Sequence, residues 1–375
     1  MSPRDIAVVG GGIGGMAAAI ALAKGGQRVK VYEQTPRFAR VGADINLTPN
    51  AVRALDGLGV GEELRRTAAQ PSHRISRTWD TGEETSRLEM ALAAEQKYGS
   101  PQLTMHRADL LAALEDALPE GSLQLGRRLT GLVEDTGAVT LTFDDGGVEI
   151  ADLVIGADGI HSVVRTATFG QEHPDFTGVV AFRAVVPAER LTGQPNLGAF
   201  TKWWGADPET QIVTFPLNRG KDIFIFATAA QDSWLEESWT APGDVTELRA
   251  MYADFHPEAR ALLDAADEVL KSALYVRDPL PRWSTDRVTL LGDACHPMMP
   301  FMAQGAGQAI EDAVVLARAL TELDLELPKQ LHAYEAARHD RTAQIQIGSR
   351  GNAWLKDSGN GDWVYAYDAW TTPLG

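Results

Sequence analysis

Hydrophobic and polar residues follow three patterns along the chain, and the first stretch is the clearest. An apolar run over residues 6–9 precedes five glycines among positions 10–15, an alanine-rich stretch to Ala23, and a second apolar run over residues 29–32. Short apolar runs favour buried strands, and longer apolar periodicity favours a helix. The first 35 residues are therefore predicted to form strand, tight turn, helix and strand.

A second pattern of short alternating stretches begins after a helical segment that starts at Arg107. The alternating stretches cover residues 128–134, 139–143 and 147–155, with turn-forming residues between them. Alternation with period two predicts strands. We expect three strands, the last of which returns to the first sheet.

The third pattern is alternation rich in β-branched and aromatic residues over 176–228, which predicts a mostly antiparallel sheet. Helical periodicity then covers 245–270 and 304–350, with one strand over 288–291 between them. The fold class is therefore predicted as α/β, with a Rossmann-like βαβ domain, an inserted antiparallel sheet and a long C-terminal helical region. The predicted domains comprise residues 1–72, 104–175 and 273–375 for the first, and 73–103 and 176–272 for the second.

Composition narrows the class of protein. The 375 residues are 44% hydrophobic and carry a formal charge of -17, which argues against a nucleic-acid partner. Cys295 is the single cysteine, so a disulfide framework or cysteine-based metal site is not expected. The longest early apolar run, residues 16–23, is too short to span a bilayer, and the N-terminus does not resemble a signal peptide. We therefore expect a cytoplasmic protein with no membrane partner.

The glycine cluster satisfies the G-x-G-x-x-G pattern between a predicted strand and a predicted helix. Such a turn lets a dinucleotide pyrophosphate approach the backbone at a helix N-terminus. Glu33 ends the second strand, where a carboxylate can bind an adenosine ribose. The pattern suits NAD and FAD equally. The residues predicted to bind the cofactor here are Gly10, Gly12, Ile13, Gly14, Gly15 and Glu33.

Two later segments distinguish between these cofactors. Residues 152–165 read D-L-V-I-G-A-D-G-I-H-S-V-V-R, and residues 291–300 read L-G-D-A-C-H-P-M-M-P before a Gly/Ala-rich helix start. In this order and context they resemble the motifs of single-component FAD-dependent aromatic hydroxylases. An Asp after a strand is also a common helix cap, and a Gly/Ala turn at a helix start is common. The resemblance extends over essentially the whole chain.

The resemblance implies roles for individual residues. Asp158 would serve the pyrophosphates, Asp293 would bind the ribityl chain, and Pro300 would border the reacting face of the flavin. The helix start at Gly305 and Ala306 would approach the pyrimidine edge of the flavin, where a helix dipole stabilises negative charge. His106-Arg107 resembles an H-R-x-x-L helix opening whose Arg lies beside FAD. Further FAD contacts are implied for Gln34, Arg40 and Leu129.

Within the family, the chain resembles the 6-hydroxynicotinate 3-monooxygenase group most, with salicylate hydroxylases beyond it. Lys202-Trp203-Trp204 and the tail at 362–368 carry this similarity. Two positions depart from the group's G-A-G-I-H segment: Asp44 replaces the second Gly, and Asn46 replaces a proton-accepting His. Asn is no base near neutral pH. Asn46 is nevertheless predicted as a catalytic-site residue.

The implied reaction uses NADH or NADPH and O2 to hydroxylate a small electron-rich aromatic or hydroxypyridine acid through a flavin C4a-hydroperoxide, with or without loss of CO2. A flavin dehydrogenase or reductase without oxygen activation, or a non-catalytic flavin-binding regulatory protein, remains an alternative. The chain is expected to act as a monomer or homodimer.

Candidate substrate contacts come from the alternating strands. Strand alternation places Phe200 with Lys202, and Gln211 with Phe215, on single faces. We predict that these four residues line the substrate pocket.

Further residues are candidates for catalysis. Arg183, or Lys202, could bind a substrate carboxylate or phenolate, although long cations on a sheet are more often solvated. His296 could relay a proton or be structural. The histidines lack metal-ligand spacing, and no metal is expected.

Overall fold

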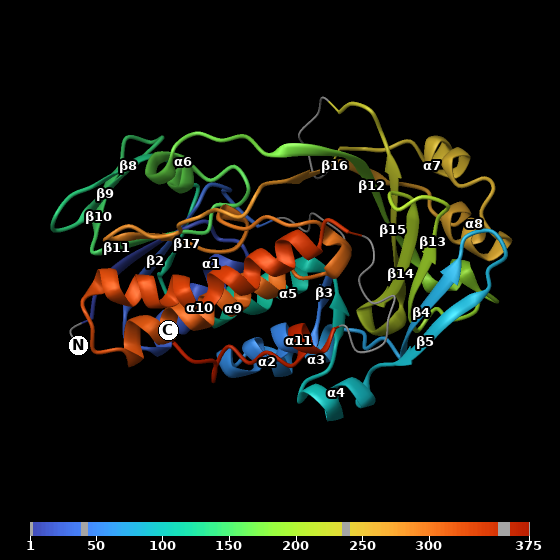
Figure 1. Cartoon of the computed structure of the whole chain (residues 1–375), viewed down its shortest axis with the longest axis horizontal. Coiled ribbons are helices and arrows are strands. Elements are labelled where there is room, and N and C mark those ends of the chain that lie inside the picture. The colour runs from blue at the N-terminus through green and yellow to red at the C-terminus, as the bar shows by residue number, and fades with distance from the viewer. Residues whose placement is uncertain (1–2, 39–43, 235–240, 352–360, 375) are drawn as a thin grey trace.

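The computed structural model describes residues 3–38, 44–234, 241–351 and 361–374. Two lobes lie side by side, and both chain termini lie in the lobe that holds the first strands (Figure 1). Within the described residues, no helix is long and apolar enough to cross a membrane.

Sheet A forms the centre of the first lobe. Its five strands are all parallel, in the order β17-β11-β1-β2-β7. The strands are β1 (Asp5–Val9), β2 (Arg28–Glu33), β7 (Leu123–Leu125), β11 (Leu153–Gly156) and β17 (Val288–Leu290). Apolar residues on both faces of a parallel sheet require that both faces be covered. The predicted strand, turn, helix and strand at the start of the chain are confirmed.

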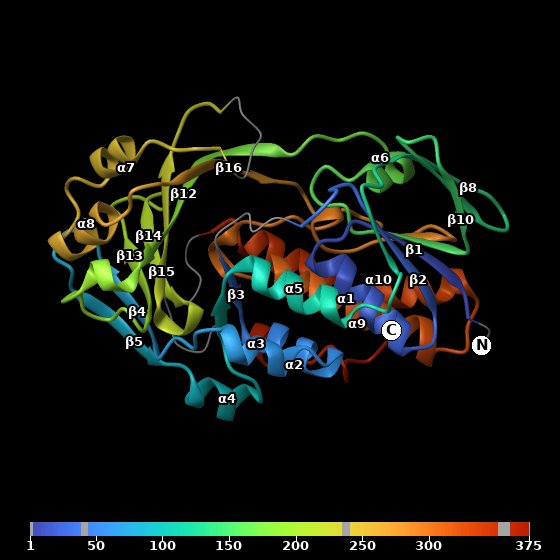
Figure 2. The same cartoon turned by 180° about the vertical axis from the view of Figure 1, so that it is seen from behind.

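Helices cover one face of sheet A, and a small antiparallel sheet packs in the same core through Phe143, whose ring centre lies 4.8 Å from that of Tyr32 on β2. The helix after the glycine turn, α1 (Ile13–Lys24), is buried from Ile13 to Leu22 and packs along α9 (Gly305–Glu322) (Figure 2). α9 in turn packs on α10 (Leu327–Gly348). The other helices are α2 (Pro49–Leu58), α3 (Gly61–Thr67), α4 (Leu92–Tyr98), α5 (Arg107–Ala117), α6 (Val163–Phe169), α7 (Val245–Met251), α8 (Pro257–Asp264) and α11 (Asp362–Tyr365).

Sheet D is a small antiparallel sheet of β8 (Leu129–Glu134), β9 (Val139–Phe143) and β10 (Val148–Ala151). The prediction of one strand over 147–155 is wrong, because the chain changes sheets at Asp152. There the Asp152 N–H donates to the Asp5 carbonyl, and its carboxylate accepts from the Asp5 N–H, both at 2.8 Å. Apolar residues lie on both sides of Asp152, in β10 and in β11, so the sequence pattern alone does not show where the chain changes sheets.

Sheet C, the large sheet of the second lobe, has seven strands in the order β16-β12-β15-β14-β13-β4-β5. Every pair is antiparallel except β13 with β4. The strands are β4 (His73–Thr78), β5 (Glu84–Glu89), β12 (Asp175–Pro187), β13 (Phe200–Trp204), β14 (Gln211–Leu217), β15 (Asp222–Ala230) and β16 (Leu270–Val276). The predicted mostly antiparallel sheet is confirmed. The exact domain boundaries stay a prediction.

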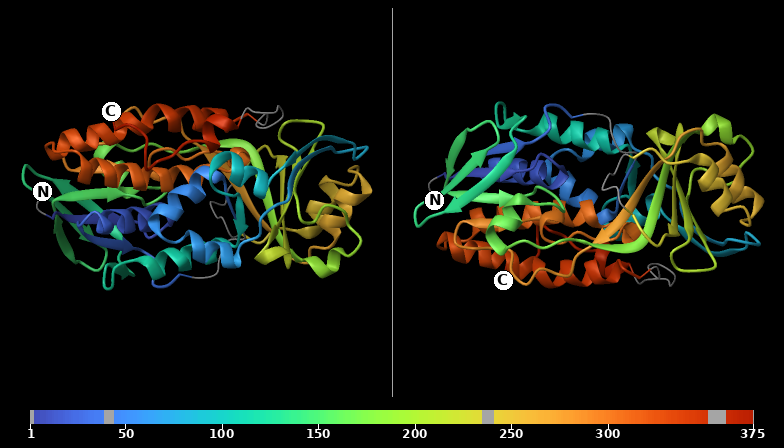
Figure 3. Two further views of the ribbon diagram at one scale, coloured as in Figure 1. Left: turned by 90° about the horizontal axis from the view of Figure 1, so that it is seen from below. Right: turned by 90° about the horizontal axis from the view of Figure 1, so that it is seen from above.

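Sheet C has two different faces. Helices α7 and α8 cover the face that points away from sheet A, where they pack on Phe182, Trp203 and Ile212 (Figure 3). The opposite face turns toward the first lobe and packs against Met299 and Phe301, which follow β17. A short ladder of β3 (Ile45–Leu47) and β6 (Leu103–Met105) lies where the lobes meet. The junction of the lobes is therefore built from segments far apart in sequence.

Candidate active site

The glycine turn between β1 and α1 closes tightly on one side and is open on the other. Gly10 has φ +107°, and a Cβ there would lie 2.3 Å from the Ala157 carbonyl oxygen. A Cβ at Gly15 would lie 2.0 Å from the Gly10 carbonyl oxygen. A Cβ at Gly12, the N-cap of α1, would meet no described atom within 4 Å. The turn thus leaves open space in front of a helix N-terminus, as binding of a pyrophosphate requires.

Two more residues of this turn bring α1 close to its neighbours. Ile13 is buried in the core. A Cβ at Gly14 would lie 2.8 Å from the Leu291 side chain and 3.0 Å from that of Ala309. Gly14 therefore allows α1 to pack against the start of α9, so the two helix N-termini lie near each other.

The Glu33 carboxylate accepts backbone hydrogen bonds at the open side of the glycine turn. One oxygen accepts from the Gly11 N–H at 2.7 Å and the other from the Thr35 N–H at 2.8 Å. A carboxylate oxygen has a second lone-pair site, so each can still accept from a ribose hydroxyl. Glu33 is partly exposed. These contacts fit the predicted role at the adenosine end of a dinucleotide.

The remaining predicted contacts around this turn have different positions. Gln34 is exposed next to Glu33, and Leu129 is buried at the start of β8. Arg40 lies outside the described residues. The cofactor roles of these residues stay predictions.

Asp158 has a structural role in the geometry that we observe. Its carboxylate accepts from the Val163 and Val164 N–H groups, at 2.7 and 3.1 Å, and from the Ser162 hydroxyl. Burial raises the pKa of this carboxyl, and these hydrogen bonds oppose the rise. Asp158 thus holds the start of α6 in the manner of a helix cap. Its role in binding the pyrophosphates of FAD and the nicotinamide cofactor stays a prediction.

Asp293 lies beside the N-terminus of α9. Its Oδ1 is 3.9 Å from the position of a Cβ built on Gly305. The side chain is exposed, yet surrounding protein raises the pKa of its carboxyl, and the charges of His296 and Arg107 lower it. Both observations describe a group that lines an open site within the protein. Asp293, a predicted flavin contact, therefore lies beside Gly305, and the charge of Arg107, another predicted contact, acts on it.

Ala306 follows Gly305 in the first turn of α9 and packs against the core of the first lobe. Pro300 begins the short turn that precedes this helix and is exposed. The Gln304 side chain does not cap the helix, because it donates to the Thr48 hydroxyl at 2.8 Å instead. The first N–H groups of α9 thus lack a side-chain cap from Gln304, which fits an anionic group held there.

His296, a candidate proton relay, packs within the first lobe. Its ring is buried, packs on Trp283, and lines a small cavity with His339 and Gln346 of α10. Its Nε2 lies 2.5 Å from the Asp312 carboxylate. The structure therefore does not bring His296 together with the predicted substrate-pocket residues.

A buried network of charges beneath the site was not predicted. Arg338 donates to Asp312 and to Glu311, each at 2.7 Å, and all three side chains are fully buried. Glu311 also accepts from Asn50 at 2.6 Å and from Arg341 at 3.0 Å. The sequence did contain a signal, because the two adjacent acids interrupt an apolar helical stretch. Buried charges of this kind are rarely found without partners.

Cys295, His296 and Asp312 place three possible metal-ligand atoms within 4.8 Å of one another. The contacts of these atoms argue against a metal there. Asp312 already accepts from Arg338, His296 and the Gly292 N–H. The Cys295 Sγ lies 3.4 Å from the Gly292 carbonyl, and burial raises the thiol pKa well above its usual value. A thiol that keeps its proton is a poor metal ligand.

One row of side chains crosses the face of sheet C that turns toward the first lobe. The strand register aligns Lys202, Val213, Phe226 and Arg183 on four neighbouring strands. Neighbouring strands are about 4.8 Å apart, so the two cations stand about 14 Å apart at their Cα atoms. The Lys202 ammonium lies 3.6 Å from the centre of the Trp204 ring, and Arg183 donates to the Ser272 hydroxyl at 2.5 Å. Val213 and Phe226 therefore form an apolar floor between the two cations, Lys202 and Arg183.

The next row completes an aromatic wall. Phe200 and Phe215 stack with ring centres 5.4 Å apart and an interplanar angle of 5°, and Phe224 packs against Phe215 at 5.0 Å. On the other side of the Lys202 row, Gln211 is buried, and its Oε1 has no hydrogen-bond partner within the described part of the chain. The four predicted pocket residues thus share one face of sheet C.

The β3–β6 ladder ties this face to the flavin-side helix. Asn46 pairs with Thr104, whose hydroxyl donates to the Pro216 carbonyl of β14 at 2.7 Å. At the other end of β3, Thr48 is bonded to Gln304 as described above. Asn46 itself accepts from the Gln102 amide at 2.7 Å. Asn46 therefore stands between the start of α9 and sheet C.

Asp44, which the sequence marked only as a departure from the family pattern, directly precedes β3. Burial raises the pKa of its carboxyl to about 6, against the opposing charges of Arg183 and Arg107. Burial in turn lowers the pKa of Arg183, and the Asp44 charge opposes that change. The charges of Asp44 and Arg183 therefore act on each other across the junction of the lobes, where Asp44 is half-buried.

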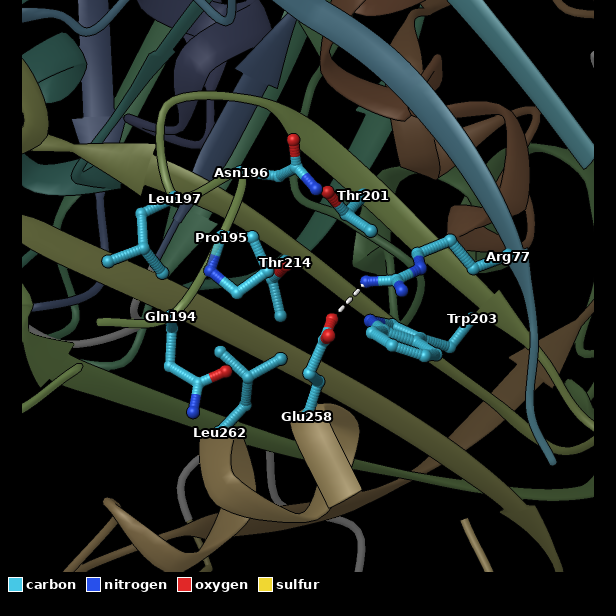
Figure 4. Close-up of a pocket in the computed structure, with 10 residues that line it drawn as sticks. All are labelled: Arg77, Gln194, Pro195, Asn196, Leu197, Thr201, Trp203, Thr214, Glu258 and Leu262. Atoms are coloured by element: carbon cyan, nitrogen blue, oxygen red, sulfur yellow. Dashed lines mark hydrogen bonds and ion pairs between the residues drawn. The ribbon is translucent and has the colours of Figure 1, made fainter. Parts of the chain in front are cut away.

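A second hollow lies on the outer face of sheet C, between its strands and α8 (Figure 4). Its lining includes Arg77, Trp203 and Glu258. Arg77 forms an ion pair with Glu258, and its guanidinium lies 4.2 Å from the centre of the Trp203 ring. This hollow is separated from the glycine turn and from Asp293 by the sheet itself. Its contacts stabilise the attachment of α8 to sheet C.

Comparisons with known proteins agree with this geometry. The family model "FAD binding domain" matches residues 4–348. The chain is 42% identical to a 6-hydroxynicotinate 3-monooxygenase from Bordetella bronchiseptica, over 99% of this chain and 97% of the other. It is 35% identical to a 3-hydroxybenzoate 6-hydroxylase from Klebsiella oxytoca, over 92% and 86%. Klebsiella pneumoniae HpxO with FAD and uric acid superposes with a TM-score of 0.84 at 27% identity, over 99% and 98%.

Proposed function

The chain belongs to the FAD binding domain family and, within it, to the FAD-dependent aromatic monooxygenases, and on this basis we propose that it hydroxylates a small hydroxyaromatic or hydroxypyridine carboxylic acid. The single observation that carries the choice of substrate is the row on sheet C, where Lys202 and Arg183 flank an apolar floor. An aromatic acid has a flat apolar ring and charged or polar ends, which match this arrangement.

The described residues fit FAD. The open space at Gly12, the Glu33 carboxylate, and Asp293 beside the uncapped start of α9 lie along one edge of sheet A and α9. We propose that they hold the pyrophosphate, the adenosine ribose and the flavin end respectively. When bound, FAD supplies the redox chemistry that couples NAD(P)H oxidation to O2. The two relatives named as a monooxygenase and a hydroxylase favour this activity over a dehydrogenase, reductase or regulatory protein.

The protein's own contribution is to hold the ring and keep water from it. Phe200, Phe215 and Phe226 supply apolar contacts to a ring, and Met299 closes the same cluster from the first lobe. A dry site strengthens the interaction of each remaining charge with the substrate. A substrate carboxylate would form a charge-assisted hydrogen bond with the cation at one end of the row.

A panel of acids tests the proposal. We expect 6-hydroxynicotinate, 4-hydroxybenzoate, 3-hydroxybenzoate or salicylate to stimulate NADH or NADPH oxidation with matching O2 uptake, and benzoate to yield no such stimulation. Mass spectrometry of the product separates gain of one oxygen atom from gain of oxygen with loss of CO2. If the flavin-loaded protein produced no oxygenated product with any hydroxy acid, the proposed substrate class would be wrong. The choice between NADH and NADPH, and between monomer and homodimer, stays a prediction.

A further inference from the structure

We propose that Asp44 is the catalytic base that accepts the proton of the substrate's ring hydroxyl, in the role that a His two residues later has in the resembling group. This inference rests on the proposed function and deepens it. It follows from the position of the carboxyl between the lobes, from the charges around it, and from the inability of Asn46 to act as a base.

The position is set by hydrogen bonds that do not involve Asp44. β3 is bonded to the start of α9 through Thr48 and Gln304, and to sheet C through Thr104 and Pro216. Asp44 directly precedes β3, at the end of the strand opposite Thr48, so it lies in the segment that joins the flavin helix to the substrate sheet.

The charges that act on the Asp44 carboxyl come from both lobes. Arg183 belongs to β12 of sheet C, and Arg107 to the first turn of α5; the Arg107 charge also acts on Asp293. Two cations favour the carboxylate form, and burial opposes it. The balance leaves a carboxyl that is ionised at neutral pH and can still take up a proton, as a general base requires.

Asn46 cannot take this role. Its Oδ1 accepts from Gln102 at 2.7 Å, and an amide has no basic lone pair available near neutral pH. An aromatic hydroxyl must lose its proton for the ring to become strongly electron-rich. In the described part of this segment, Asp44 is the group that can accept it.

Asp44 takes the proton of the substrate's ring hydroxyl before the ring is oxygenated. The substrate O–H bond breaks, the proton moves to an Asp44 oxygen, and the electron pair stays on the ring oxygen, which enriches the ortho and para carbons. One of these carbons forms the new C–O bond with oxygen derived from O2, and NAD(P)H supplies the two electrons that reduce the other oxygen atom to water. When that carbon loses its hydrogen or CO2 and aromaticity returns, the Asp44 proton can return to the ring oxygen.

The assignment also orients the substrate. With the hydroxyl at Asp44, near Arg183, the carboxylate lies at the other end of the row, at Lys202. The hydroxyl and carboxylate are then at opposite ends of the ring. An acid with these groups in para positions fits this arrangement best.

An equilibrium experiment separates this role from a structural one. The dissociation constants of 4-hydroxybenzoate and 4-methoxybenzoate are measured from flavin absorbance changes of the FAD-loaded enzyme between pH 5 and 8, without NAD(P)H. Only the hydroxy acid can donate to Asp44, and a hydrogen bond to a charged acceptor contributes about 1.5–3 kcal/mol. We expect its advantage over the ether to fall by about five- to tenfold between pH 8 and pH 5, as Asp44 becomes protonated. In Asp44→Asn the ratio should not change with pH.

Turnover provides the second measurement. Asp44→Asn should lower the kcat for the best panel acid by about 10²–10⁴-fold, the usual contribution of a general base. The double variant Asp44→Gly/Asn46→His, which recreates the G-A-G-I-H pattern, should restore most of that loss. Asp44→Glu keeps a carboxyl and replaces Asp44→Asn in the comparison if the latter does not load FAD; it should retain the pH-dependent ratio.

The outcomes distinguish the two proposals. If the acids bind and turn over but the ratio is independent of pH, or if Asp44→Asn keeps wild-type kcat, Asp44 is not the base and the proposed function stands. If neither acid perturbs the flavin and no panel acid is oxygenated, the proposed function itself fails.

Discussion

His296 and Asp312 form a buried pair in which Nε2 lies 2.5 Å from the carboxylate, below the turn that carries Asp293. The second Asp312 oxygen accepts from Arg338 at 2.7 Å, and the Gly292 N–H also donates to Asp312. The carboxylate thus fixes the backbone of the turn as well as the imidazole. We regard His296 and Asp312 as positioning residues for the flavin end of the site.

Asp312→Asn should destabilise the protein strongly. The substitution leaves the buried Arg338 with one acidic partner fewer, and breaking a buried ion pair from one side costs about 3–5 kcal/mol. Urea unfolding followed by circular dichroism measures the loss. Glu322→Gln, which removes an exposed acid from the end of the same helix, is the matched control and should change stability by less than about 0.5 kcal/mol. Equal stability of the two variants would contradict a stabilising role for the network.

The His296–Asp312 pair also predicts how the stability of the protein depends on pH. His296 and Arg338 hold the pKa of the Asp312 carboxyl at about 2, although burial alone would raise it. A carboxyl whose pKa is lower in the folded state adds stability above its unfolded pKa, about 4, and loses it as the pH falls toward 2. Wild-type stability should therefore fall between pH 4 and 2 more steeply than that of Asp312→Asn. Parallel curves from urea titrations at each pH would contradict this.

Gly12→Ala should separate cofactor binding from folding. Gly12 has φ -75° and ψ -176°, which alanine adopts freely, and a Cβ there meets no described protein atom within 4 Å. The methyl group would instead occupy the space assigned to the pyrophosphate. We expect unchanged stability of the FAD-free protein and at least tenfold weaker FAD binding, measured by fluorescence titration. Gly131→Ala, where a Cβ also meets no described atom, is the control and should leave both values unchanged.

The comparison between sequence and structure shows which features a pattern can reveal. The glycine turn was predictable because its sequence signal is local: the strand, the turn and the helix follow one another along the chain. The close approach of Gly10 to Ala157 is a long-range contact that this pattern does not show. The shared face of Phe200 and Lys202 was predictable for the same reason, since strand alternation is local. The strand prediction over 147–155 failed because the change of sheets at Asp152 depends on a contact with Asp5, far away in sequence.

Long-range contacts also explain what was missed at the site. From the sequence alone His296 was a candidate proton relay, but its partner Asp312 lies on α9, and its ring packs on Trp283 and beside α10. In the sequence, Asp44 was notable only because it replaces the second Gly of the group's G-A-G-I-H segment. Its proximity to Arg183 and Arg107 arises from the meeting of three segments, which no single stretch of the chain encodes.

The ionised Asp44 carboxylate should destabilise the folded protein. Burial raises the pKa of its carboxyl to about 6, above the ordinary value near 4. The folded state then binds the proton more tightly, so its stability falls as the pH rises from about 4 to about 6, and the cost of the buried charge is fully present above that range. Asp44→Asn should therefore raise the Tm of the flavin-loaded protein at pH 8 and change it little at pH 4. A Tm difference independent of pH would contradict the raised pKa.

Lys202→Gln tests the other end of the substrate. If Lys202 binds the carboxylate, its loss should raise the KM for 4-hydroxybenzoate, or for the best panel acid, by about 10–100-fold, because a hydrogen bond to a charged group contributes about 1.5–3 kcal/mol. The KM for the corresponding carboxamide should change much less, since the amide carries no charge. Lys221→Gln, which removes an exposed lysine from the turn between β14 and β15, is the matched control and should leave both KM values unchanged. An equal rise for acid and amide would mean that Lys202 shapes the pocket through its packing on Trp204 and not through its charge.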